Sequence, residues 1–216
     1  MITLPIHDYP TRSASGFLIR YVMPRSVPPQ LVGPLDRKQL FRMQAIGDCI
    51  VGVGHGAPDA YAGHNNEVLM TADSVPNVKD KVIILLSCQT AQQLGPSLIQ
   101  AGAASFIGWK EDFVWVMDAD QVTTPWKDEW ASPAILPVVG CINDILDGKT
   151  TGEAFDNMLR GFAEAAAEED EEIITSCLLF NRKNAVLLGD RSAKVRVTPR
   201  IKVPIPPPPI IFPISQ

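Results

Sequence analysis

Two residues with reactive side chains each follow an apolar run of the sequence. His55 comes after residues 48–53 (DCIVGV), and Cys88 comes after residues 82–86 (VIILL). A cysteine attacks as its thiolate, and a nearby imidazole can take the thiol proton or stabilise the thiolate. Neighbouring strands of an open parallel sheet line one crevice at their carboxyl ends. If the two runs are such neighbours, Cys88 is predicted to be a nucleophile with His55 as its base.

The residues around this pair fit the same chemistry. Gly54 and Gly56 flank His55, and their lack of a Cβ lets a substrate backbone approach. Backbone N–H groups near Gly56 and Cys88 could form an oxyanion hole for a tetrahedral intermediate. Each residue also has a plainer interpretation, because a cysteine at a strand end is usually core packing and a histidine beside glycines is often a turn residue.

The positions of the apolar runs predict an α/β fold whose sheet is largely parallel. Runs of buried-strand type occur at residues 16–23, 48–53, 82–86, 104–109 and 185–188. Residues 57–80 are predicted to form a loop, because glycine, asparagine, aspartate and proline occur throughout them.

Helices are predicted between these strands. Asp36 caps a helix that runs to Ile46, and further helices cover residues 92–101 and 133–146. A capping box of Thr150 and Glu153 starts another helix, which ends in the solvated acidic run 168–172. A helix starting soon after Cys88 would add the positive end of its dipole to the site.

Four ordered segments resemble the caspase-like cysteine peptidases, and most closely their gingipain-like and CHAT-domain branches. The segments are IVGVGHG (50–56), VIILLSCQTA (82–91), LIQAGAASFIGW (98–109) and NAVLLGD (184–190). The chain departs from the family in two places. The caspase pentapeptide Q-A-C-x-G is absent, and Arg191 stands where gingipain-like domains usually have proline.

The resemblance implies a caspase-like three-layer sandwich, in which helices flank a mostly parallel sheet. It implies peptide-bond hydrolysis with His55 as the general base and Cys88 as the nucleophile. It also implies that the backbones of Gly56 and Cys88 supply the oxyanion donors, and that the partner is a peptide or protein substrate. No metal or organic cofactor is expected.

Substrate recognition is predicted from the same resemblance, because members of this family often bind a basic side chain in an acidic pocket. Candidates for that pocket are Asp48, Asp112, Asp118 and Asp120, all of which could instead be ordinary loop or strand-end carboxylates. Trp109 opens a segment that holds four tryptophans and could wall a cleft. A packed loop or a subunit contact is an equal interpretation of that segment.

Proline divides the chain into one domain and two arms. Residues 1–15 are predicted to be an extended N-terminal arm, residues 16–196 the α/β domain, and residues 197–216 a proline-rich C-terminal arm. Proline lacks the backbone donor that a helix or an interior strand requires. The isoleucines and phenylalanine of the last segment favour docking in a groove, so both arms are predicted to join copies of the chain into a homo-oligomer.

A second function, from a different class, therefore competes with the peptidase. The same fold could serve as a catalytically silent building block of a homopolymer, such as a tube, ring or filament. Labelling of Cys88 by an iodoacetamide-type probe favours the enzyme, and assembly that depends on the C-terminal arm favours the building block.

Composition excludes several other classes. The 216 residues carry a formal net charge of −5, with 46% hydrophobic and 20% charged residues, which is ordinary globular usage. The acidic balance argues against nucleic acid as the main partner. No apolar run approaches the roughly 18 residues that span a membrane, and the first residues lack the features of a secretory signal. A cytoplasmic location is expected, or an extracellular one after export as an assembly.

The remaining cysteines and histidines are assigned structural roles. Cys49, Cys141 and Cys177 have apolar neighbours and are predicted to be core thiols. The four cysteines form no C-x-x-C motif, which argues against a structural zinc site. His7 and His64 are predicted to be exposed surface residues.

Overall fold

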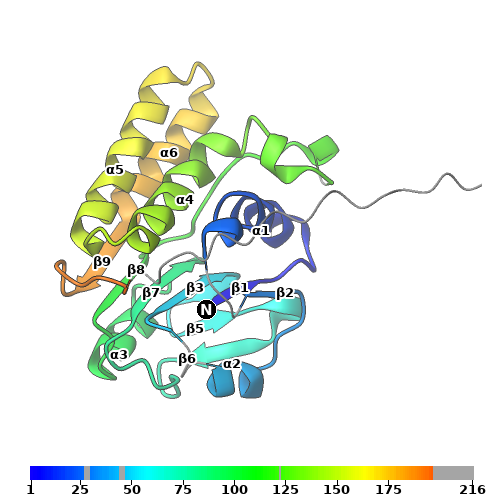
Figure 1. Ribbon diagram of the computed structural model, residues 1–216. Helices are drawn as coiled ribbons and strands as arrows, with labels where there is room; N and C mark the ends of the chain where they lie inside the picture. The colour runs from blue at the N-terminus through cyan, green and yellow to red at the C-terminus, as the bar shows by residue number, and fades with distance from the viewer. Residues whose placement is uncertain (27–29, 44–46, 122, 197–216) are drawn as a thin grey trace, which may run out of the picture.

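A six-stranded sheet forms the centre of the molecule (Figure 1). The computed structural model describes residues 1–26, 30–43, 47–121 and 123–196. The strands follow the order β2 (Gln30–Val32), β1 (Ile2–Leu4), β3 (Cys49–Val53), β7 (Val82–Leu86), β8 (Ser105–Trp109) and β9 (Ala185–Gly189). All neighbouring strands are parallel except β8 and β9, which are antiparallel.

The three central strands are apolar on both faces, as strands covered by two layers must be. Every residue of β3, β7 and β8 is buried. Strand β3 pairs with β7 from Cys49 opposite Val82 to Val53 opposite Leu86. The predicted strands at 48–53, 82–86, 104–109 and 185–188 are therefore confirmed within one residue.

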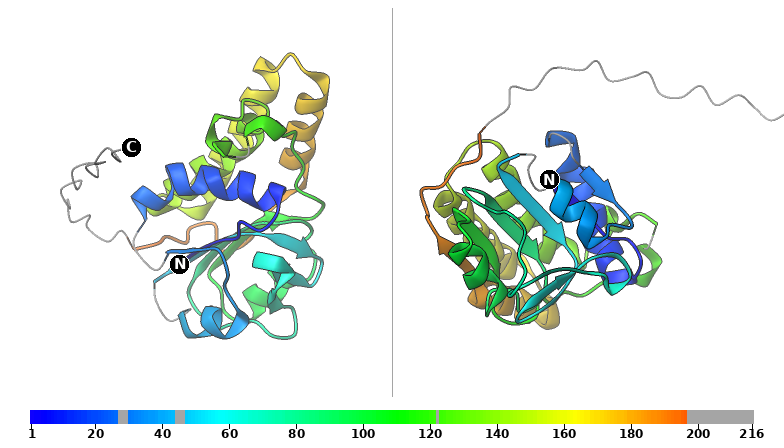
Figure 2. Two further views of the ribbon diagram at one scale, coloured as in Figure 1. Left: turned by 90° about the vertical axis from the view of Figure 1, so that its right-hand side faces the viewer. Right: turned by 90° about the horizontal axis from the view of Figure 1, so that it is seen from below.

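Helices cover both faces of the sheet, and two separate apolar cores result (Figure 2). One face carries α1 (Tyr9–Tyr21), α4 (Ser132–Leu146), α5 (Thr151–Glu168) and α6 (Glu172–Asn184). The other face carries α2 (Arg37–Met43), α3 (Leu94–Gln100) and a small antiparallel sheet of β4 (His55–Ala57), β5 (Ala60–Ala62) and β6 (Val68–Thr71). Short 3-10 turns lie at Met23–Arg25, His64–Asn66, Ala119–Gln121 and Pro125–Lys127. The predicted three-layer α/β sandwich is confirmed.

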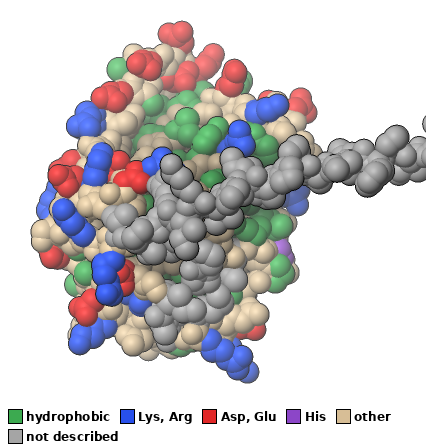
Figure 3. Space-filling view, viewed as in Figure 1, with side chains coloured by type: hydrophobic (Ala, Val, Ile, Leu, Met, Phe, Trp, Pro, Cys, Tyr) green, Lys and Arg blue, Asp and Glu red, His purple; other side chains and the backbone are tan. Residues whose placement is uncertain are grey.

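Local sequence signals account for several helix ends. Thr150 accepts the Glu153 backbone N–H at 3.1 Å, and the Glu153 carboxylate accepts the Thr150 N–H at 2.9 Å, which is the predicted capping box. Gly148 follows α4 with a φ of +90°, a conformation that favours glycine. Figure 3 shows acidic side chains gathered where α5 meets α6, in agreement with a solvated run at 168–172. None of the helices in the described ranges is both long and apolar enough to cross a membrane.

The N-terminal fifteen residues are not an extended arm, and this prediction is wrong. They supply β1, which lies between β2 and β3, and the first half of α1. Pro10 is compatible with the helix because it occupies the first turn, where its missing N–H has no intrahelical partner anyway. The strand predicted at 16–23 is also wrong, since most of it belongs to α1. The C-terminal arm and its role in assembly lie outside the described residues.

The segment 57–80 is more ordered than predicted. It contains β5 and β6, and β5 pairs with β4 on one side and with β6 on the other to form the small sheet. Tyr61 in β5 is buried and donates a hydrogen bond from its hydroxyl to the Val53 carbonyl at 2.7 Å. This sheet therefore fixes the chain that leaves the end of β3.

Helix α1 is held in place by a glycine contact that a substitution can test. A Cβ added to Gly16 would lie 2.2 Å from Pro125 Cγ, whereas one added to Gly140 in α4 would meet nothing within 4 Å. We expect G16A to lower the free energy of unfolding by about 1–3 kcal/mol through overpacking. We expect G140A to be neutral or to raise it by up to about 1 kcal/mol through helix propensity. Urea unfolding of both variants is the measurement, and equal stabilities would contradict the close packing of α1.

Candidate active site

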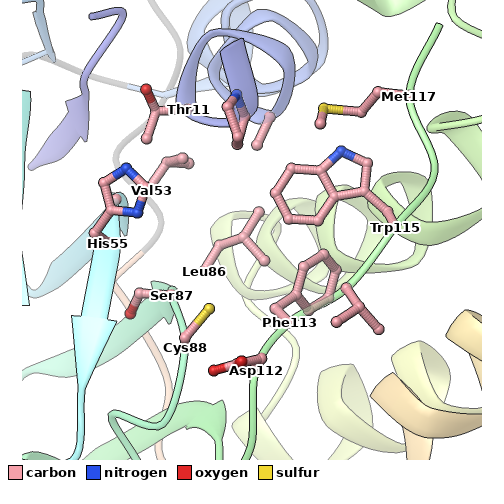
Figure 4. A pocket seen from close by; sticks show the side chains of 14 residues that line it. Thr11, Val53, His55, Leu86, Ser87, Cys88, Asp112, Phe113, Trp115 and Met117 are labelled. Atoms are coloured by element: carbon pink, nitrogen blue, oxygen red, sulfur yellow. The ribbon is translucent and has the colours of Figure 1, made fainter. Parts of the chain in front are cut away.

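The register of β3 and β7 brings the predicted catalytic pair to one edge of the sheet. Val53 lies opposite Leu86, and His55 and Cys88 each follow two residues later. Gly54 continues the pairing by donating its N–H to the Leu86 carbonyl at 3.2 Å. His55 and Cys88 line the same cavity, whose volume is about 340 Å³ (Figure 4).

Gly56 lies directly against the backbone of Cys88. A Cβ at this position would be 2.0 Å from the Cys88 carbonyl oxygen and 2.9 Å from its nitrogen. Glycine is therefore required here for steric reasons, and it lets the loop that carries His55 approach the loop that carries Cys88. The amide of Cys88, one of the two predicted oxyanion donors, lies next to Gly56, the other.

The chain turns sharply after Cys88. Gln89 has a φ of +59°, a left-handed conformation that non-glycine residues rarely adopt. Its backbone N–H donates to the Glu111 carbonyl at 3.1 Å, which holds the turn in place. This turn separates Cys88 from α3, which begins only at Leu94 and is too short and remote to act through its dipole.

Asp8 completes the site, and the sequence analysis did not identify it. Its Oδ2 lies 2.5 Å from His55 Nε2. Its Oδ1 accepts the Thr11 backbone N–H at 2.9 Å and the Thr11 hydroxyl at 2.6 Å, so the same carboxylate is the N-cap of α1. An aspartate before a Pro-containing first turn is a recognisable helix start, but nothing local links it to a histidine 47 residues away.

The charge of Asp8 is stabilised by these contacts. Partial burial acts to raise the pKa of this carboxyl group, but hydrogen bonds from Thr11 and His55 outweigh it and hold the pKa at about 2. The carboxylate can accept a hydrogen bond from the Nε2–H group of His55. In that tautomer Nδ1 keeps a free lone pair. Figure 4 shows one of the two ring nitrogens on the cavity side of the ring.

The surroundings of the Cys88 thiol favour its protonated form. Burial raises its pKa above the ordinary value, and the backbone N–H of Phe113 acts in the opposite direction. The Asp112 carboxylate, which lines the same cavity, raises the pKa further. A base is therefore needed to generate the thiolate, since the surroundings of the sulfur do not favour it.

The rest of the cavity is mainly apolar. Leu86 lies at its base, and Phe113, Trp115 and Met117 form a wall opposite His55 in Figure 4. The other lining residues are Pro10, Thr11, Ala14, Val53, Gly54, Ser87 and Val114. Asp112 is the one acidic side chain that lines this cavity in the described part of the chain.

Four of the predicted substrate residues lie elsewhere. Asp48 stands at the amino end of β3, away from His55, and pairs with Arg196 at 2.7 Å. Trp109 is fully buried because it belongs to β8, and its indole N–H donates to the Asn181 carbonyl at 3.1 Å. Asp118 accepts the backbone N–H of Asp120 at 2.9 Å, and neither residue lines the cavity. These predictions are corrected, whereas Asp112 lies beside Cys88.

The predictions for the other thiols and imidazoles agree with the structure only in part. Cys49 and Cys141 are buried as predicted, and Cys177 is partly exposed on α6. His7 and His64 are not free surface residues. The centroid of the His7 ring lies 5.8 Å from that of His55 and 5.1 Å from that of His64.

The effect of Asp112 on the thiol gives a testable prediction. We expect D112N to lower the pKa of Cys88, because it removes a negative charge that disfavours the thiolate. Alkylation of Cys88 by iodoacetamide at pH 7 should then be faster, by up to about tenfold for a change of one pKa unit. The rates of the two proteins should converge at pH values above both thiol pKa values. D73N, at an exposed carboxylate away from the cavity, is the control, and an unchanged rate for D112N would contradict the assignment.

The fold is similar to that of solved proteins, whereas the sequence matches no family model. No protein-family model matches the chain, and no curated protein sequence matches it. Among solved structures, it is similar to the Arg-specific cysteine proteinase gingipain R, with a TM-score of 0.61 and 13% identity over 91% of this chain and 47% of that one.

Two further structures show the same likeness. A complex of the pro- and mature domains of RgpB from Porphyromonas gingivalis has a TM-score of 0.62, with 13% identity over 91% of this chain and 48% of that one. A structure described as a protease has a TM-score of 0.57, with 14% identity over 90% and 48% of the respective chains. The chain thus spans about half the length of these proteins, and it has the caspase-like fold of a gingipain cysteine proteinase.

Proposed function

We propose that this protein is a cysteine endopeptidase that uses Cys88 as the nucleophile and His55 as the general base. The observation that carries the proposal is that Cys88 and His55 line one cavity at the carboxyl ends of two paired strands, with the Asp8 carboxylate bound to the His55 ring. The likeness of the fold to a cysteine proteinase supports it.

Acylation begins with a proton transfer. The Cys88 S–H gives its proton to Nδ1 of His55, and the resulting thiolate attacks the carbonyl carbon of the substrate peptide bond. Asp8 orients the ring through Nε2 and stabilises the imidazolium that forms. The negative charge on the carbonyl oxygen is stabilised by the backbone N–H groups of Gly56 and Cys88.

Acylation ends and deacylation follows. In the last step of acylation the C–N bond of the tetrahedral intermediate breaks, and the leaving amine takes the proton from His55. The acyl group remains on Cys88 as a thioester. A water molecule then gives a proton to His55 and attacks the thioester, and the C–S bond breaks. Cys88 recovers its proton as the carboxylic acid leaves.

The apolar cavity wall determines which side chain fits beside the thiol. Phe113, Trp115 and Met117 offer burial to an apolar group, whereas Asp112 is exposed and already accepts the Gln89 side-chain amide at 2.9 Å. Gingipain R is described as Arg-specific. The cavity here instead favours a leucine or an aromatic residue before the cleaved bond, because a guanidinium would lose hydration against an apolar wall.

Peptide cleavage tests the nucleophile and the base. We expect C88A and H55A each to lower the rate of cleavage of a mixed peptide library by at least about 10³-fold, since both groups form covalent or proton-transfer contacts with the reacting atoms. C177A is the matched control, because Cys177 is a partly exposed thiol away from the cavity. It should retain full activity. Thermal unfolding checks that each variant is folded.

Other results would contradict this proposal. Cleavage that survives in C88A would assign the activity to another residue. An absence of both cleavage and iodoacetamide labelling at Cys88 in the intact protein would leave the catalytically silent building block as the function.

Substrate preference is tested with matched peptides that differ only before the cleaved bond. We expect kcat/KM for leucine or phenylalanine to exceed that for arginine by at least about tenfold, which is a typical discrimination by an apolar pocket. Aspartate should be cleaved more slowly still, because it also meets the charge of Asp112. A preference for arginine would show that the acidic group, and not the apolar wall, governs recognition.

A further inference from the structure

We propose that His7, Asp8 and His55 form a binding site for a divalent metal ion of the zinc class, and that the ion reversibly switches off the base of the peptidase. The second half of this proposal rests on the proposed function, whereas the binding site itself does not. The sequence predicts no metal site, and the fold is what brings these residues together.

Three ligand atoms of suitable type converge at this point. His55 Nε2 lies 2.5 Å and His7 Nε2 lies 2.9 Å from the same oxygen, Asp8 Oδ2, and all three atoms lie within 4.8 Å of one another. In a tetrahedral zinc site with bonds of about 2.0–2.1 Å, ligand atoms are about 3.3 Å apart. The two nitrogen–oxygen distances would therefore have to lengthen by less than about 1 Å to admit an ion.

Asp8 is oriented for this role by α1. Its Oδ1 is held by the backbone N–H and the hydroxyl of Thr11, which leaves Oδ2 directed at both histidines. Such support from residues behind the ligand is common in metal sites, because it fixes the donor atom in place.

The surroundings of His7 are also unusual for a purely structural histidine. Its side chain is only 12% exposed, and its Nδ1 is buried without a hydrogen-bond partner among the described residues. His64 lies beside it and also has a buried Nδ1 that lacks such a partner in the same part of the chain. The His7 ring thus lies beside the rings of both other histidines of the sequence.

This donor set selects the ion. Two imidazoles and one carboxylate suit zinc and neighbouring transition metals, whereas calcium and magnesium prefer an all-oxygen set. Three protein ligands leave one tetrahedral position for water. His55 is 43% exposed, so an ion can reach the site from solvent.

Metal binding would change the proton positions on His55. Without an ion, Nε2–H donates to Asp8, and Nδ1 has a lone pair for the Cys88 proton. An ion at Nε2 takes the lone pair of that nitrogen, so the proton of the neutral ring must reside on Nδ1. Nδ1 then cannot accept the thiol proton, so the base that generates the thiolate is lost. Removal of the ion restores the base.

Calorimetric titration of the chelator-treated full chain with zinc chloride tests the site. We expect one zinc ion per chain, and an affinity at least about tenfold lower in H7A and H7N, either of which removes one ligand. C88A should bind as tightly as the wild type. With cobalt in place of zinc, the protein should show the visible bands of a tetrahedral ion without a thiolate-to-cobalt charge-transfer band.

Several results would overturn the site. These are an absence of binding, equal binding by the wild type and both folded His7 variants, or a loss of binding in C88A. The last result would place the ion between Cys88 and His55, on the opposite edge of the ring. None of these measurements depends on peptidase activity, so a failure of the proposed function leaves them valid.

Peptide cleavage tests the inhibition separately. We expect zinc to lower the cleavage rate of the wild type by at least about tenfold and a chelator to restore it. H7A and H7N, each compared with its own rate without zinc, should resist inhibition at the same concentration. Equal inhibition of all three proteins would show that zinc acts on the thiol, and it would refute the switch.

Discussion

The parallel pairing of β3 with β7 is the interaction on which the geometry of the site depends. Both strands are buried along their whole length, so a slip of one residue would turn apolar side chains from one core to the other. Since the register is fixed in this way, His55 and Cys88 leave the sheet at the same level. The close approach of Gly56 to the Cys88 backbone then removes the remaining freedom between the two loops.

Much of the sheet could be predicted because its strands are long apolar runs with clear ends. The N-terminal region could not, because β1 has only three residues and is stabilised by β2 and β3, which lie on either side of it. Residues 16–23 have strand-like composition, but Gly16 packs on Pro125 and the apolar residues of the segment cover the sheet as a helix. Tertiary contacts thus override local preference in that region.

The same distinction holds for the site. Cys88 and His55 could be proposed from the sequence because each follows a strand that is recognisable by itself. Asp8 and His7 could not, since their relation to His55 exists only after α1 docks on the sheet. Trp109 was misplaced because a tryptophan-rich segment says nothing about which rings face a cavity, and this ring lies within β8 whereas Trp115 lies on the loop that follows it.

Asp8 joins two structural tasks in one carboxylate, since one oxygen closes the first turn of α1 and the other holds an imidazole. The two contacts are thermodynamically linked. A ligand that binds the ring therefore changes the stability of that turn, and the turn changes the affinity for the ligand by the same free energy. Local unwinding at the start of the helix would release the ring while the sheet stays folded. Hydrogen exchange at the Thr11 amide would therefore report on the occupancy of the neighbouring cavity.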